Sequence, residues 1–140
     1  MRLTSRSSRS LDLARLEALG LGAVEIGTAH LLLGLAREGR ENGDPLLADV
    51  DPDRVRGLLP MRGGDVGSPP LSPCAAASLA VAARHAAGGR VDVTHLLAAV
   101  LTYPSSTAIG VLERLGVDAG HLWVRATAAV PEPTPLLVRR

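Results

Sequence analysis

The sequence predicts an all-α protein: a pseudo-twofold bundle of eight helices made of two four-helix halves. Its β-branched residues are scattered and do not alternate over more than a few positions, so no strand is expected. Apolar residues instead recur at helical spacing between capping residues, glycines and prolines. The segment Ile26–Leu35 also aligns with Val91–Val100 at an offset of 65 residues, and the pairs His30/Leu47 and His95/Leu112 are both 17 residues apart. This self-similarity predicts two copies of one unit.

The first half is expected to contain four helices. Thr4 and Ser5 are favourable N-caps for a helix that continues to Gly20, a residue typical of C-terminal caps. Thr28 is expected to cap a second helix, His30–Glu38, which is apolar nearly all round and is therefore predicted to be central. Two shorter helices follow, each with proline in its first turn, where a missing N–H costs nothing: Pro45–Val50 and Pro52–Leu59.

The second half is expected to repeat this arrangement. Ser72 and Pro73 restart a helix, which ends near Gly88. Its predicted buried stripe is Leu79, Ala82, Ala83 and Ala86. The next helix begins at Asp92 or Thr94 and runs to Leu101. Two more helices are expected, Ser105–Leu115 and Asp118–Val130, the last presenting Leu122, Ala126, Ala129 and Val130 on one face.

These elements define one domain over residues 1–130. Repeat one covers residues 3–59 and repeat two covers residues 72–130, joined by a glycine- and proline-rich linker over residues 60–71. The tail, residues 131–140, has three prolines and two terminal arginines and is predicted to be disordered.

Composition excludes several classes of function. All 15 basic residues are arginine, so a P-loop ATP site and a Schiff-base lysine are ruled out. The only aromatic residues are Tyr103 and Trp123, too few for the base-stacking platforms of single-strand nucleic-acid binders. With a net charge of +1 the chain has no basic stripe for a duplex, so no nucleic acid is expected as a partner. The apolar runs are far shorter than the roughly 20 residues of a membrane span, so no membrane is expected either.

The sequence offers no catalytic constellation, and we expect no enzyme activity, metal or cofactor. The single cysteine, Cys74, cannot form an intramolecular disulfide, which fits a reducing cytoplasm. Cys74 has no histidine partner placed by sequence spacing. His30 and His95 hold equivalent positions in the two halves, without further residues at metal-ligand spacing. We interpret both as core imidazoles hydrogen-bonded to a neighbouring loop.

Three motifs together resemble the double Clp repeat, the N-terminal domain of the ClpA and ClpC class of AAA+ protein unfoldases. They are the hydroxyl N-caps Thr4 and Ser72, the segment Ile26–Gly39 (IGTAHLLLGLAREG) and the segment Val111–Asp118 (VLERLGVD). The resemblance covers residues 3–130. It implies an eight-helical, non-catalytic domain that receives adaptors and substrates. Since the ATPase modules are missing from this sequence, the chain is expected to be a stand-alone version of that domain.

The resemblance also implies where a ligand could bind. In the ClpC branch, the two helix starts bind phosphorylated arginine: backbone N–H groups and the capping hydroxyl hold the phosphate, and a glutamate holds the guanidinium. By this resemblance the binding residues are Leu3 and Thr4 in repeat one and Leu71 and Ser72 in repeat two. Leu3 and Leu71 stand where many members have an aromatic residue, so a ligand that stacks on such a ring would bind differently here.

The two glutamate positions of that site are Ala29 and Thr94. A guanidinium would therefore lose a charge-assisted hydrogen bond of about 1.5–3 kcal/mol, unless Glu25 or Asp92 reaches across.

The expected function is binding of a protein or peptide at the helix starts and in the groove between the repeats. Its partners would be a Clp unfoldase, an adaptor or a substrate, and its role that of an adaptor, decoy or regulator in Clp-dependent proteolysis. The alternative is a protein that sequesters a small molecule, such as a cyclic peptide antibiotic, in the same groove.

Overall fold

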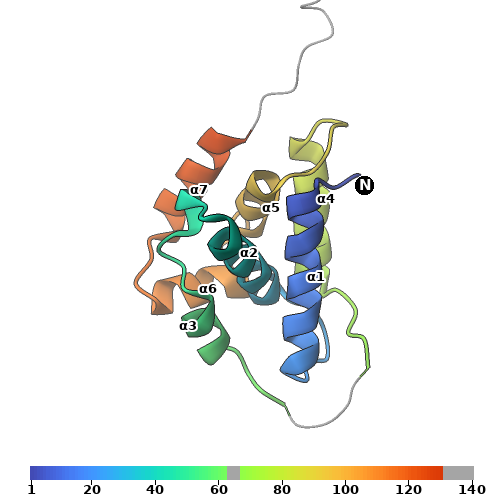
Figure 1. The fold of residues 1–140 in the computed structure, drawn as a ribbon, viewed down its shortest axis with the longest axis vertical. Coiled ribbons are helices and arrows are strands. Elements are labelled where there is room, and N and C mark those ends of the chain that lie inside the picture. Colours follow the sequence, from blue (N-terminus) through green and yellow to red (C-terminus); the bar gives the residue numbers. More distant parts are fainter. Residues whose placement is uncertain (63–66, 131–140) are drawn as a thin grey trace, which may run out of the picture.

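The computed structural model describes residues 1–62 and 67–130. The middle of the expected linker and the tail predicted to be disordered, residues 131–140, lie outside this part. No strand forms among the described residues, which confirms the all-α prediction (Figure 1). In chain order the elements are α1 (Ser5–Gly20), α2 (Thr28–Asn42), the 3-10 helix η1 (Pro45–Leu47), α3 (Pro52–Gly57), α4 (Pro73–His85), α5 (Val93–Val100), α6 (Thr107–Arg114) and α7 (Ala119–Ala129).

Seven of the expected helices are α-helices, whereas the helix predicted at Pro45–Val50 is a single 3-10 turn. Asp44 caps this turn, accepting a hydrogen bond from the Leu46 N–H at 3.0 Å. The preceding helix, α2, also differs from the prediction, because it continues to Asn42 instead of ending at Glu38. Asp51 caps the next helix, α3.

The polar end of α2 is helical because its side chains have partners on neighbouring elements. Glu38 pairs with an arginine of α1, Arg37 donates to Glu17 of α1 at 3.0 Å, and Arg40 donates to Asp51 at 2.8 Å. Gly43, with φ of 61°, then ends the helix in the left-handed conformation that favours glycine. Periodicity of apolar residues does not report these ion pairs, so the prediction stopped the helix too early.

The N-cap of α2 is Gly27 and not the predicted Thr28. The imidazole Nδ1 of His30 accepts a hydrogen bond from the Gly27 N–H at 2.9 Å. The His30 side chain therefore caps the helix start in place of a threonine hydroxyl. Thr28 instead contacts α6, where its Oγ1 lies 2.9 Å from Oγ1 of Thr107. Its hydroxyl is used between helices rather than within its own.

Helix α2 lies at the centre of the bundle, as its apolar composition predicts (Figure 1). Leu32 and Leu33 are both 0% exposed. Helix α1 packs tightly against α2 at Gly34, where an added Cβ would collide with the Ser10 carbonyl oxygen. The absence of a side chain at Gly34 therefore sets the distance between the two helices.

The two repeats are joined by reciprocal backbone pairing. The segment before α1 pairs with the segment before α5 through a parallel bridge between Leu3 and Val91. The segment before α4 pairs with the segment before α2 through a parallel bridge between Ile26 and Leu71. Each repeat thus offers its helix-start segment to the other in the same way, which is the pseudo-twofold relationship expected from the repeat.

Two predicted faces are confirmed only in part. On α4, Ala82 and Ala86 are buried as expected, but Leu79 and Ala83 are only partly buried, and the other buried residues are Ala75, Ser78 and Val81. On α7, Leu122 and Ala126 are buried as expected, but Ala129 is exposed. These helices carry small and apolar residues on more than one face, so the spacing of apolar residues alone does not identify the face that packs against the core.

The pseudo-symmetry is broken after the central helices. α2 and α5 begin at equivalent positions, but α2 has 15 residues and α5 only 8. Among the described residues, no helix is long and apolar enough to cross a membrane.

Candidate functional site

The first predicted helix start, at Leu3 and Thr4, is occupied by groups of the protein itself. Thr4 is the N-cap of α1, and its Oγ1 accepts a hydrogen bond from the Ser7 N–H at 3.2 Å. The same hydroxyl donates to Oδ1 of Asp92 at 2.8 Å. Leu3 is partly buried against the core. The Asp92 carboxylate therefore lies where a bound anion would be expected, and it would repel a phosphate.

The second helix start, at Leu71 and Ser72, has a different environment. Ser72 is buried, and its Oγ caps α4 by accepting from the Ala75 N–H at 3.1 Å. The residue equivalent to Asp92 is Gly27, so this start carries no matching carboxylate. Leu71 is 41% exposed. The two helix starts are thus similar in backbone, but only the first carries a carboxylate.

The structure does not bring the two helix starts together. Helices α1 and α4 run in opposite directions (Figure 1). Arg2 donates to the carbonyl of Gly88, beyond the end of α4, whereas Ile26, beyond the end of α1, pairs with Leu71 before α4. The starts therefore lie at opposite ends of a 16-residue helix, roughly 24 Å apart.

Ala29 and Thr94 lie on helix starts but are poorly placed to touch a ligand. Ala29 is 3% exposed, and its N–H donates to Oγ1 of Thr107 at 3.2 Å. Oγ1 of Thr94 is buried and without a hydrogen-bond partner among the described residues. Glu25 is exposed ahead of α2. Neither Ala29 nor Thr94 therefore supplies the carboxylate that the resembled site has at its position.

His30 and His95 have the same structural role in the two repeats. Nδ1 of His30 accepts from the Gly27 N–H at 2.9 Å, and Nδ1 of His95 accepts from the Asp92 N–H at 2.8 Å. Burial lowers the pKa of His30, and the nearby Glu17 carboxylate partly offsets this shift. Burial also lowers the pKa of His95, and there the Asp92 carboxylate partly offsets the shift. Both imidazoles are thereby kept neutral as capping acceptors.

A pocket of about 400 Å³ lies between the two repeats, beside the second helix start. Its apolar walls include the predicted residue Leu71 together with Ile26 from the reciprocal bridge. Arg15, whose side chain is 58% exposed and forms an ion pair with Asp12 at 3.8 Å, also lines the pocket. Sequence reasoning missed the other lining residues, which are Leu11, Leu31, Ser68, Pro69 and Leu79. The feature that marks this pocket is the partial burial of the apolar side chains of Leu11 and Leu79, which is visible only in the folded structure.

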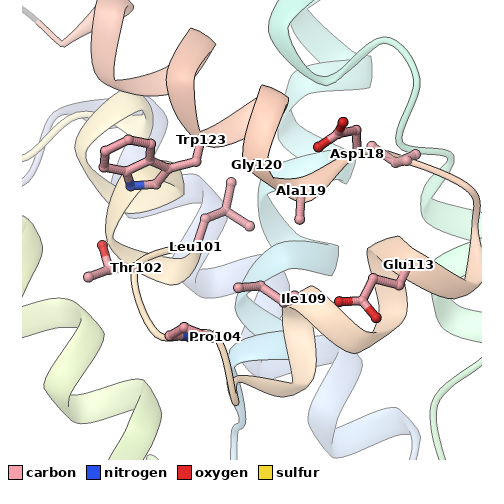
Figure 2. Close-up of a pocket in the computed structure, with 10 residues that line it drawn as sticks. Leu101, Thr102, Pro104, Ile109, Glu113, Asp118, Ala119, Gly120 and Trp123 are labelled. Atoms are coloured by element: carbon pink, nitrogen blue, oxygen red, sulfur yellow. The ribbon is translucent and has the colours of Figure 1, made fainter.

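A second pocket, of about 490 Å³, was not anticipated at all (Figure 2). It lies within repeat two, between the end of α5, helix α6 and the start of α7. Trp123, the single tryptophan of the chain, lines one end of it. The two pockets share no lining residue.

Within residues 1–62 and 67–130, no group of three or more histidine, cysteine, aspartate or glutamate side chains could hold a metal ion. Cys74 is half-buried in the first turn of α4.

Comparisons with known proteins bear on this arrangement. No protein-family model matches the sequence. A segment of 38 residues, 27% of this chain, is 58% identical to the negative regulator of genetic competence ClpC/MecB of Bacillus subtilis (strain 168), and it spans 5% of that protein. The N-terminal domain of the chaperone ClpD from Arabidopsis thaliana superposes with a TM-score of 0.76 at 24% identity, covering 91% of this chain and 93% of that one.

Two further solved structures have the same fold. The Hsp104 N-terminal domain from Candida albicans superposes with a TM-score of 0.67 at 16% identity, over 90% of this chain and 89% of that one. A chain from a malarial protein secretion system superposes with a TM-score of 0.62 at 17% identity, over 91% and 94% of the two chains. The described part of this chain therefore has the fold of the ClpD and Hsp104 N-terminal domains.

Proposed function

We propose that this chain is a non-catalytic module that binds protein or peptide segments in the pocket between its repeats. The observation that carries the proposal is the combination of a pocket of about 400 Å³, lined by six apolar residues with Arg15 and Ser68, and the exposed side chain of Leu71 at its rim. Pockets of this size, mostly apolar with few polar groups, are typical ligand sites. Arg15 in the lining would favour a segment that carries a carboxylate.

The proposed cellular role is that of an adaptor, decoy or regulator of Clp-dependent proteolysis in the cytoplasm. Its support is the Clp N-terminal fold and the 58% identity of one segment to ClpC/MecB. In this role the chain would compete with the N-terminal domain of an unfoldase for the same segments, or present them to it.

The binding test uses a permanently unfolded protein, reduced and carboxymethylated lactalbumin, as the probe. Leu71→Asp places a charge at the pocket rim and is expected to weaken binding about tenfold, the cost of losing most of one leucine contact. Leu19→Asp is the matched control, because Leu19 is 45% exposed on α1 and does not line this pocket. Equal binding by both variants and the parent chain would disprove the assignment of the site.

The regulatory test measures ATP-dependent degradation of the same probe by a purified ClpC and ClpP assembly. Addition of the parent chain is expected to change the degradation rate in proportion to its concentration, and addition of Leu71→Asp is expected to have a much weaker effect. An unchanged rate with a chain that still binds the probe would refute the regulatory role and leave the binding function intact.

A second candidate is sequestration of a small molecule in the same pocket, which the volume of about 400 Å³ favours. A thermal-shift series against cyclic peptide antibiotics tests it, because a ligand that binds only the folded state raises Tm with its concentration. A concentration-dependent rise that Leu71→Asp abolishes would support sequestration. A rise in Tm with carboxymethylated lactalbumin but with none of the cyclic peptides would favour the first proposal.

A further inference from the structure

The pocket at the corner of α5, α6 and α7 has no counterpart in the function proposed above. It exists because α5 ends at Val100, whereas the equivalent helix α2 continues for two more turns. In repeat two the chain instead leaves the helix and turns at Pro104 before α6 begins. The corner that remains is lined by the end of α5 and by the facing sides of α6 and α7 (Figure 2).

One end of this corner pocket is apolar and aromatic. Leu101, Ile109 and Ala119 form its floor, and the indole of Trp123 lies beside Leu101 (Figure 2). Leu101 is 5% exposed and therefore fixed, while Trp123 is 40% exposed. An exposed indole next to an immobile apolar floor provides a contact surface for one large apolar side chain.

The other end of the corner pocket is acidic. Glu113 of α6 and Asp118 at the start of α7 both line it, and none of the arginines in the described part of the chain does. Oδ1 of Asp118 accepts from the His121 N–H at 2.9 Å. The Glu113 carboxylate is exposed and has neither a hydrogen bond nor an ion pair with any described residue. The acids therefore keep negative charge available to a ligand.

We propose that the corner pocket binds a basic peptide segment in which an arginine or lysine stands next to a large apolar residue. The apolar side chain packs between Trp123 and Leu101, and the cation pairs with Glu113 and Asp118. Charge complementarity selects this class of partner, because an acidic segment would be repelled by both carboxylates and a purely apolar one would leave them unpaired. Among the described residues that line the inter-repeat pocket, the charged one is instead Arg15.

The fluorescence of Trp123 tests this directly, because it is the only tryptophan. Three short capped peptides that differ at one position serve as probes: Ala-Leu-Arg-Leu-Ala and the same peptide with Gln or Glu in place of Arg. The Arg peptide is expected to shift the emission with saturation, and its affinity is expected to fall as salt is raised. Equal titration curves for the Arg and Glu peptides would overturn the proposal.

Variants locate the site and separate it from the inter-repeat pocket. Glu113→Gln is expected to weaken the Arg peptide about fivefold, the scale of an exposed ion pair. Ala119→Leu is expected to abolish binding by filling the floor, with circular dichroism to show that the fold is intact. Glu25→Gln makes the same chemical change near the inter-repeat pocket and is expected to have no effect, as is Leu71→Asp. Weakening by Glu25→Gln or Leu71→Asp with no effect of Glu113→Gln would overturn the assignment to this corner.

Discussion

Arg6 of α1 and Glu38 of α2 form an ion pair with two hydrogen bonds, Nε to Oε2 at 2.7 Å and Nη2 to Oε1 at 2.9 Å. The Glu38 side chain is 1% exposed, whereas that of Arg6 is 37% exposed. The pair therefore satisfies a buried carboxylate from the edge of the bundle, and it joins α1 to the polar half of α2.

Removal of Arg6 should destabilise the folded protein, because the Glu38 carboxylate would stay buried without its cation. Arg6→Ala leaves Glu38 with Asn42 as its remaining side-chain donor. We expect a loss of about 2–3 kcal/mol in the free energy of unfolding. This loss is smaller than for a fully buried pair because the Arg6 side chain is partly solvated. Arg9→Ala is the control, because Arg9 and Glu41 are both exposed. It should cost less than about 1 kcal/mol in urea unfolding. Equal losses would contradict this account.

The close approach of α1 and α2 should tolerate no side chain at Gly34. Gly34→Ala would place Cβ within 2.8 Å of the Ala14 nitrogen as well as against the Ser10 carbonyl, so the helices must separate. We expect a loss of about 3 kcal/mol. Gly110→Ala, in the open interior of α6, should instead stabilise the protein by about 0.5–1 kcal/mol. Denaturant midpoints of the two variants that move in the same direction would refute the packing argument.

Stability should fall as the solution is acidified toward pH 5.5. The pKa values of His30 and His95 are lowered in the folded state by burial, so the unfolded chain takes up protons first. Their contribution is complete above the unfolded pKa of about 6.5 and is lost as the pH falls below it.

Urea unfolding at pH 7.5 and pH 5.5 measures this loss. In the double variant His30→Gln and His95→Gln, glutamine can accept the same N-cap hydrogen bonds without titrating. We expect the pH dependence over this range to shrink strongly in that variant and to persist in His121→Gln, which alters an exposed histidine. Persistence in the double variant would assign the effect to other groups.

The starts of α2 and α6 cap each other, and the two threonines involved should be energetically coupled. The Ala108 N–H donates to Oγ1 of Thr28, the Ala29 N–H donates to Oγ1 of Thr107, each at 3.2 Å, and the hydroxyls lie 2.9 Å apart. Thr28→Val and Thr107→Val should each cost about 1–2 kcal/mol. The double variant should lose at least about 0.5 kcal/mol less than the two losses added together. Additive losses would show that the threonines act separately.

The sequence by itself determined the class of fold, the repeat and most helix limits. Caps such as Thr4, Ser72 and Asp118 are local signals, since a side chain that bonds its own helix start needs no distant partner. The apolar first half of α2 likewise placed that helix at the centre, because a stretch without a polar face must be covered on all sides.

Tertiary structure decided the rest, because those features depend on residues far apart in the chain. The length of α2 follows from ion pairs to α1 and α3, and the local charge of the first helix start follows from Asp92, which lies 88 residues from Thr4. Sequence reasoning named Leu71 at a helix start, without placing it in the inter-repeat pocket, and missed the corner pocket of Glu113 and Trp123. A cavity is the space that several packed elements leave between them, and periodicity within one element carries no information about that space.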